Sequence, residues 1–105
     1  MSKMSKTDKR SITQFNSFVS SQTKDWGELG DVVRGGVIAM AAAYDGSLER
    51  TITAMLGIYC GGAVLRAQGV ARATPEMVIN AVPLGDDPVV VKALADLADL
   101  RAHTR

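Results

Sequence analysis

Aromatic residues are scarce in this chain of 105 residues, which contains only five of them. A core with so few rings must be built from Val, Leu, Ile, Met and Ala, which favours packing of helix on helix over a β-sandwich. No segment alternates polar and apolar residues in the way that a half-buried strand does. The sequence therefore predicts an all-α protein. The aromatic residues are Phe15, Phe18, Trp26, Tyr44 and Tyr59.

Cysteine and histidine are nearly absent, with one residue of each. Cys60 cannot form an internal disulfide, and its apolar surroundings in the sequence indicate a reduced thiol in a cytoplasmic protein. One cysteine and one histidine do not make a zinc site, and no glycine-rich phosphate-binding motif is present. We expect no metal, no cofactor and no enzymatic activity. An enzyme that uses Cys60 with His103 is the least favoured alternative, because cysteine in an apolar segment usually serves as a small core residue.

Charge is missing from two long segments in the middle of the chain. No charged residue lies between Arg50 and Arg66, and none lies between Arg34 and Asp45. A surface helix shows a polar face at every turn, so helices in these segments must be covered on nearly every side. Both segments are shorter than the roughly 20 apolar residues that span a bilayer, and we expect no membrane insertion.

Local signals predict five helices. Ser11 with Gln14 has the form of a capping box, Asp25 and Ser47 are candidate N-caps, and proline follows Thr74 and Asp87 at two further helix starts. The predicted helices cover about residues 12–20, 25–45, 47–68, two turns from 75, and 88–102. In the last helix we expect one apolar side that faces the core, formed by Val90, Val91, Leu94, Leu97, Ala98 and Leu100.

Small residues recur at intervals of four in the second and third predicted helices. Glycine inside a helix costs about 1 kcal/mol relative to alanine, so these glycines indicate close approach of another backbone. The short link at Asp45–Gly46 makes the two helices an antiparallel hairpin, whose halves pack on each other or on a second copy. The residues assigned to self-association or close helix packing are Gly35, Ala39, Ala43, Gly57 and Gly61.

A single domain is predicted for residues 11–105, preceded by a flexible basic tail over residues 1–10. Five helices of this size can enclose at most one apolar helix completely, so the other finds its cover on a second subunit. The predicted fold is thus a four- or five-helix bundle with a central glycine- and alanine-rich hairpin, assembled as a homodimer.

The function predicted from the sequence is that of a non-enzymatic interaction module. It would act as a homodimeric adaptor, inhibitor or regulator that binds a protein partner. The alternative is a small DNA-associated transcriptional regulator whose basic N-terminal arm contacts phosphates. That arm would use Lys3, Lys6, Lys9 and Arg10.

Overall fold

Helix α3 (Leu48–Ala67) lies at the centre of the molecule and contacts all the other helices. The computed structural model describes residues 4–83 and 85–103, and every regular element in that part of the chain is a helix. The predicted all-α class is therefore confirmed. The other elements are α1 (Lys6–Gln22), α2 (Glu28–Ala42), α4 (Pro75–Asn80) and α5 (Pro88–His103).

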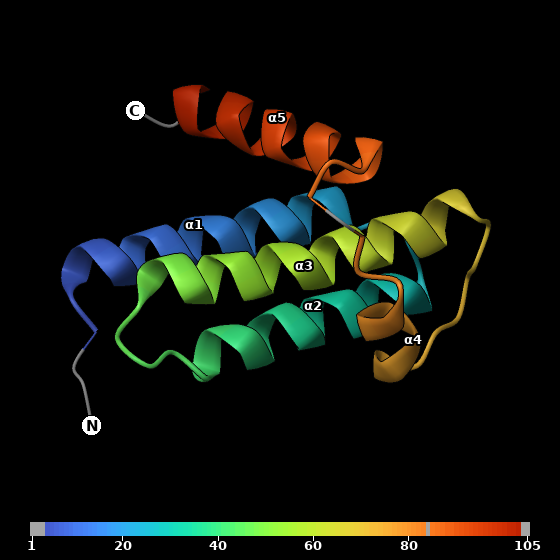
Figure 1. Ribbon diagram of the computed structural model, residues 1–105, viewed down its shortest axis with the longest axis horizontal. Helices are drawn as coiled ribbons and strands as arrows, with labels where there is room; N and C mark the ends of the chain where they lie inside the picture. Colours follow the sequence, from blue (N-terminus) through green and yellow to red (C-terminus); the bar gives the residue numbers. More distant parts are fainter. Residues whose placement is uncertain (1–3, 84, 104–105) are drawn as a thin grey trace.

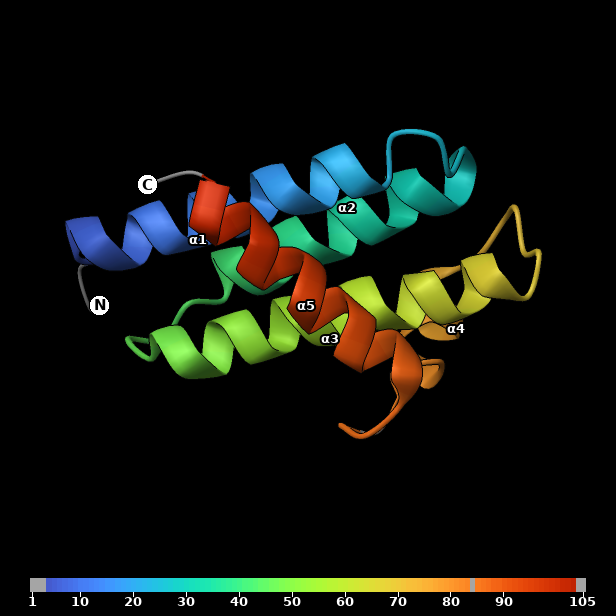
Figure 2. The ribbon, with the colours of Figure 1, turned by 90° about the horizontal axis from the view of Figure 1, so that it is seen from above.

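The first three helices run side by side, and the last two are placed against α3 (Figure 1). The short α4 lies near the C-terminal end of α3 and the N-terminal end of α2. Figure 2 shows α5 crossing over α3 toward α1. Within the described residues, none of the helices combines the length and the apolar character needed to cross a membrane.

Helix α1 is longer than the predicted helix over residues 12–20. It begins at Lys6, because the hydroxyl of Ser5 accepts a hydrogen bond from the backbone N–H of Asp8 at 3.0 Å. The predicted cap at Ser11 was wrong, since Ser11 lies inside the helix. The first turns are polar and show no apolar periodicity, which is why the pattern of the sequence placed them in a tail. The hydrogen bonds at the N-terminus of the helix, and not an apolar pattern, therefore account for these turns.

Helix α2 starts three residues later than the predicted cap at Asp25. Its N-cap is Gly27, with φ of 65°, and no side chain caps this end. Instead, the backbone N–H of Leu29 donates to the carbonyl of Ala71 at 3.1 Å. The loop after α3 thus satisfies one of the amides that a helix leaves unpaired at its N-terminus, and a sequence pattern local to Asp25 cannot reveal that partner.

The predicted starts of the next two helices are confirmed. The hydroxyl of Ser47 accepts from the N–H of Arg50 at 3.2 Å, and that of Thr74 accepts from the N–H of Met77 at 3.3 Å. Gly46 precedes α3 with φ of 101°, in the region that favours glycine. These signals succeed because both partners lie within one turn of each other.

The α2–α3 hairpin packs closely through two glycines. A Cβ at Gly36 would lie 2.9 Å from Cγ2 of Ile58, and a Cβ at Gly62 would overlap Cγ2 of Val33. Helix α3 is continuous through Gly61 and Gly62. The glycines therefore let neighbouring elements approach α3 and do not interrupt it.

Helix α5 is rotated relative to the prediction. Val90 and Ala93 are buried against the bundle, whereas Val91 and Leu94 are 55% and 46% exposed. Apolar residues cover more than half of the circumference of this helix, but only one narrow stripe contacts α3 and α1. The single apolar side predicted from periodicity was thus wrong in part, and the side chain of Leu100 lies outside the described residues.

Candidate functional site

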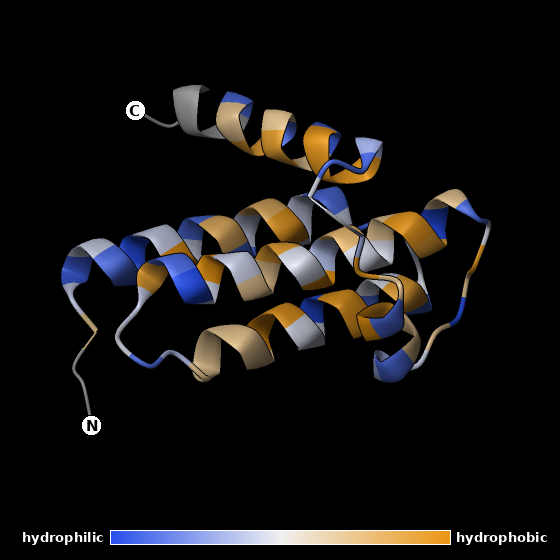
Figure 3. Cartoon of the chain, in the orientation of Figure 1, coloured by the Kyte–Doolittle hydropathy of each residue, from blue (hydrophilic) through white to orange (hydrophobic). Residues whose placement is uncertain are grey.

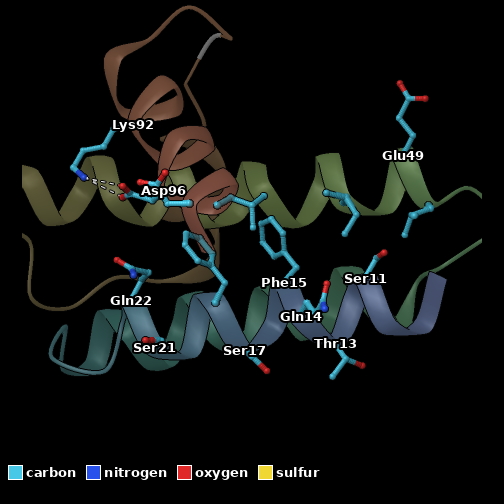
Figure 4. A pocket seen from close by; sticks show the side chains of 15 residues that line it. Ser11, Thr13, Gln14, Phe15, Ser17, Ser21, Gln22, Glu49, Lys92 and Asp96 are labelled. Carbon is cyan, nitrogen blue, oxygen red and sulfur yellow. Dashed lines mark hydrogen bonds and ion pairs between the residues drawn. The ribbon is translucent and has the colours of Figure 1, made fainter. Parts of the chain in front are cut away.

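A groove of about 870 Å³ opens between α1, the N-terminal half of α3 and α5. Figure 4 shows α1 along one side, α3 along the other, and α5 at one end. A volume of this size falls in the range of ligand-binding clefts. Large apolar residues contribute to its lining: Phe15, Phe18, Leu48, Ile52 and Leu97.

An aromatic cluster fixes the floor of the groove. The rings of Phe15 and Phe18 meet edge to face, with centroids 6.0 Å apart, and Phe18 meets Tyr59 in the same way at 5.4 Å. On the far side of Tyr59, the ring of Trp26 stacks at 5.9 Å. Such ring pairs hold their geometry more firmly than aliphatic contacts do. Phe15 and Phe18 are each only 2% exposed, so the floor of the groove is part of the core.

The wall formed by α1 is polar but carries no charge. From Ser11 to Gln22 the helix contains no acidic or basic residue, and its side chains on the groove make no hydrogen bond with any other described residue. Their hydroxyl and amide groups are free to bond a ligand or water. In Figure 4, Ser11, Gln14 and Gln22 point toward α3, whereas Thr13 and Ser17 point away from it. The polar lining residues of α1 are Ser11, Thr13, Gln14, Ser17, Ser21 and Gln22.

The charges of the groove all belong to α3 and α5. Lys92 binds both carboxylate oxygens of Asp96, at 3.2 and 3.0 Å. Glu49 forms no ion pair or hydrogen bond with another described residue, and Asp99 is the remaining charged residue of the lining. Acidic residues thus outnumber the single base in this groove.

A second surface feature is the outer face of α2, which consists of Gly35, Ile38, Ala39, Ala42 and Ala43. All five residues are exposed, Ile38 to 60%. The last turns of α2 show no hydrophilic colour in Figure 3. A Cβ at Gly35 would meet no atom within 4 Å. Packing within the chain therefore gives no reason for a glycine at this position.

The two predicted stripes of small residues do not meet each other. Gly35, Ala39 and Ala43 face outward, whereas Gly57 and Gly61 face α4 and the residues after it. A Cβ at Gly61 would overlap the carbonyl oxygen of Val78, and one at Gly57 would lie 3.5 Å from Val82. The contact inside the hairpin depends on Gly36 and Gly62 instead. Each of them follows a glycine of the four-residue spacing by one position, and so points to a different side of its helix.

The residues of the predicted basic arm lie mainly on α1. Lys6, Lys9 and Arg10 are exposed residues of its first two turns, and Lys3 lies outside the described residues. Their spacing places them on one face of the helix. They precede the groove wall but do not line it.

Cys60 is buried in α3 and is only 1% exposed. Burial, and to a lesser extent the charge of Asp87, raise the pKa of its thiol to about 11. The thiol is therefore protonated at neutral pH, whereas a nucleophilic cysteine needs a thiolate. The side chain of His103 lies outside the described residues, and in the described part of the chain no three Cys, His, Asp or Glu residues are grouped to hold a metal ion.

The groove was not predicted from the sequence. Its floor comes from core residues, and its walls come from helices distant in the chain, so no local pattern defines it. The one available signal was the run from Ser11 to Gln22, a helix with an exposed face and no charge. Comparisons with protein-family models, curated proteins and solved structures find no match to this chain.

Proposed function

We propose that this chain is a non-enzymatic protein-interaction module that acts as a homodimer through the outer face of α2. The observation that carries the proposal is the difference between the two apolar helices. Helix α3 is surrounded by the other four, whereas α2 leaves an apolar outer face uncovered. Exposed apolar surface of this kind is common at sites of association.

The shape of this face supports pairing with a copy of itself. Ile38 projects from a surface that is otherwise made of glycine and alanine. Across a two-fold axis, each Ile38 would enter the shallow surface beside Gly35 and Ala39 of the other copy. The absence of a Cβ at Gly35 would let the two helices approach closely. That pairing gives the otherwise costly glycine a role.

Charged residues border the apolar face at both ends. Glu28 forms an ion pair with Arg72 at 3.0 Å near the start of α2, and Asp45 pairs with Arg50 at 3.2 Å beyond its end. An apolar centre with a polar rim is the usual anatomy of a protein interface. The exposed ion pairs would fix the orientation of the two copies more than they would add affinity.

Sedimentation velocity of Ile38→Glu and Ile79→Glu tests the proposal. Ile79 is a matched control, because it is 56% exposed and lies on α4, away from the outer face of α2. We expect the unchanged chain and Ile79→Glu to sediment as dimers at micromolar concentration, and Ile38→Glu as a monomer of 11.1 kDa. A monomeric unchanged chain, or equal effects of the two substitutions, would refute self-association through α2.

A nucleic-acid regulator is the second candidate. The observation that favours it is the placement of Lys6, Lys9 and Arg10 on one exposed face of α1, where none of them forms an ion pair with a described residue. In a dimer, two such faces would be available to phosphates. This candidate places the contact on the first turns of α1, not on a flexible arm.

A further inference from the structure

We infer that the groove between α1, α3 and α5 binds an amphipathic helix of a partner protein, with its basic residues toward α3 and α5. The inference rests on the proposed function as an interaction module, but not on dimerisation. No residue of α2 lines the groove, so the two proposed surfaces share no residue. One copy could therefore use both surfaces at once.

The dimensions of the groove suit a helix. Its α1 wall extends from Ser11 to Gln22, which corresponds to about 17 Å of helix. A partner helix of about three turns would match that length. Its apolar ridge would cover the half-buried side chains of Leu48, Ile52 and Leu97, in the way that amphipathic helices enter hydrophobic grooves.

The absence of charge on the α1 wall favours binding of a partner in the groove over a groove that is filled only by water. Burying Ser11, Gln14 or Gln22 against a partner removes no charge from water, and their hydroxyl and amide groups can bond to polar side chains of the partner. Depletion of charge is also typical of the buried centre of an interface.

The charged residues on α3 and α5 determine which charge the partner helix should carry. The lining contains three acids, Glu49, Asp96 and Asp99, and one base, Lys92. Lys92 and Asp96 pair with each other, whereas Glu49 makes no pair with any described residue. In Figure 4 the carboxylate of Glu49 points away from α1, at the edge of the groove, so a lysine or arginine at the edge of the partner helix would complement it. Lys6, Lys9 and Arg10 on the first turns of α1 do not line the groove. A preference for an acidic partner would therefore indicate binding to these bases and not to the groove.

Two synthetic peptides provide the probe. Each has 14 residues with leucine on one helical face, and the other positions are lysine in one peptide and glutamate in the other. Added to the full ¹⁵N-labelled chain, the Leu–Lys peptide should shift the amide signals of residues 11–22, 48–52 and 92–97. It should also bind more tightly than the Leu–Glu peptide, with an affinity that falls as salt is added.

Charge substitutions with matched controls locate the binding. Glu49→Gln should weaken binding of the Leu–Lys peptide about three-fold, whereas Glu76→Gln should not. Both glutamates are the second residue of their helix, so the loss of the favourable helix-dipole interaction is common to both. Gln14→Lys should also weaken binding about three-fold, while Gln68→Lys, at the end of α3, should have no effect.

Three results would overturn the inference: equal binding of the two peptides, preference for the Leu–Glu peptide, or signal shifts confined to the outer face of α2. Sedimentation separates this outcome from failure of the proposed dimer. Glu49→Gln and Gln14→Lys should leave the dimer intact, and Ile38→Glu should leave binding of the Leu–Lys peptide unchanged. Either proposal can then fail without the other.

Discussion

The hydroxyl of Tyr44, just after α2, donates a hydrogen bond to a carboxylate oxygen of Asp8 in α1 at 2.5 Å. This bond joins the beginning of the first helix to the end of the second, residues that are far apart in the sequence. The hydrogen bond to Asp8 is also the main reason why the pKa of the Tyr44 hydroxyl is raised. The first turns of α1 are thereby held by a tertiary contact as well as by the Ser5 cap.

Tyr44→Phe should loosen the first turns of α1. The ring is retained, so only the bond to Asp8 is lost, and the effect should be local. We expect faster amide hydrogen exchange over residues 9–12, with unchanged exchange in α3. Tyr59→Phe is the control, since that ring lies in the core near the opposite end of α1 and should not change exchange at residues 9–12.

Gly35→Ala and Gly62→Ala should have opposite effects on the free energy of unfolding of the isolated chain. A Cβ at Gly35 meets open space, so alanine should stabilise the helix by about 1 kcal/mol. A Cβ at Gly62 would overlap Val33, so alanine there should cost about 1–3 kcal/mol through overpacking. Urea unfolding, performed on an Ile38→Glu background to remove the proposed dimer, measures both. Equal signs would contradict the described packing of α2 on α3.

Gly35→Leu should weaken the proposed dimer without unfolding the chain. The space outside Gly35 accepts a side chain, but a leucine would hold the second helix away from α2. We expect at least a ten-fold rise in the dimer dissociation constant, with the far-UV circular dichroism unchanged. A dimer of unaltered affinity would place the interface elsewhere.

Stability should fall at alkaline pH. Burial raises the pKa of Cys60 to about 11 and that of Tyr59 to about 12. Both groups therefore keep their protons in the folded chain after the unfolded chain has lost them. The stabilisation is fully present below about pH 9 and is lost as pH rises through 11 to 12, with a slope of up to about 1.4 kcal/mol per pH unit for each group.

Urea unfolding at pH 8, 10 and 11 measures this loss. Tyr59→Phe and Cys60→Ala should each reduce the slope, because each removes one titrating group. If the double substitution left the slope unchanged, burial of these two groups would not be its cause.

The nucleic-acid candidate predicts loss of DNA binding when the bases of α1 are removed together. Replacement of Lys6, Lys9 and Arg10 by glutamine should weaken binding of a fluorescent duplex and lower the dependence of affinity on salt by up to about three units. Replacement of Lys24, Arg66 and Arg72, which lie elsewhere on the surface, is the control. Fluorescence anisotropy that shows no binding by the unchanged chain would remove this candidate.

Much of the fold could be predicted because its signals are local. Ser47 and Thr74 cap helices through atoms three residues away, and glycine ends a helix through its own backbone freedom. The failures involve distant partners. The start of α2 depends on Ala71, and the side of α5 that faces inward depends on the limited width of its contact with α3 and α1.

The candidate site illustrates the same limit. Periodicity of four selected both Gly35 and Gly61, but it could not tell that one faces outward and the other faces α4. The groove depends on the separation of α1 and α5, which no pattern within either helix contains. Homodimerisation and partner binding stay predictions.

The close approach of the Val78 carbonyl to Gly61 has a consequence for which positions tolerate mutation. Helix α4 is seated there by the main-chain carbonyl and the buried side chain of Val78. Met77 and Ile79, which are 41% and 56% exposed, should be more open to replacement by polar residues than Val78 is. Position 61 is not open to replacement, since any larger residue would push a whole helix away. Tolerance to mutation should therefore change abruptly between α4 and the surface of α3 on which it rests.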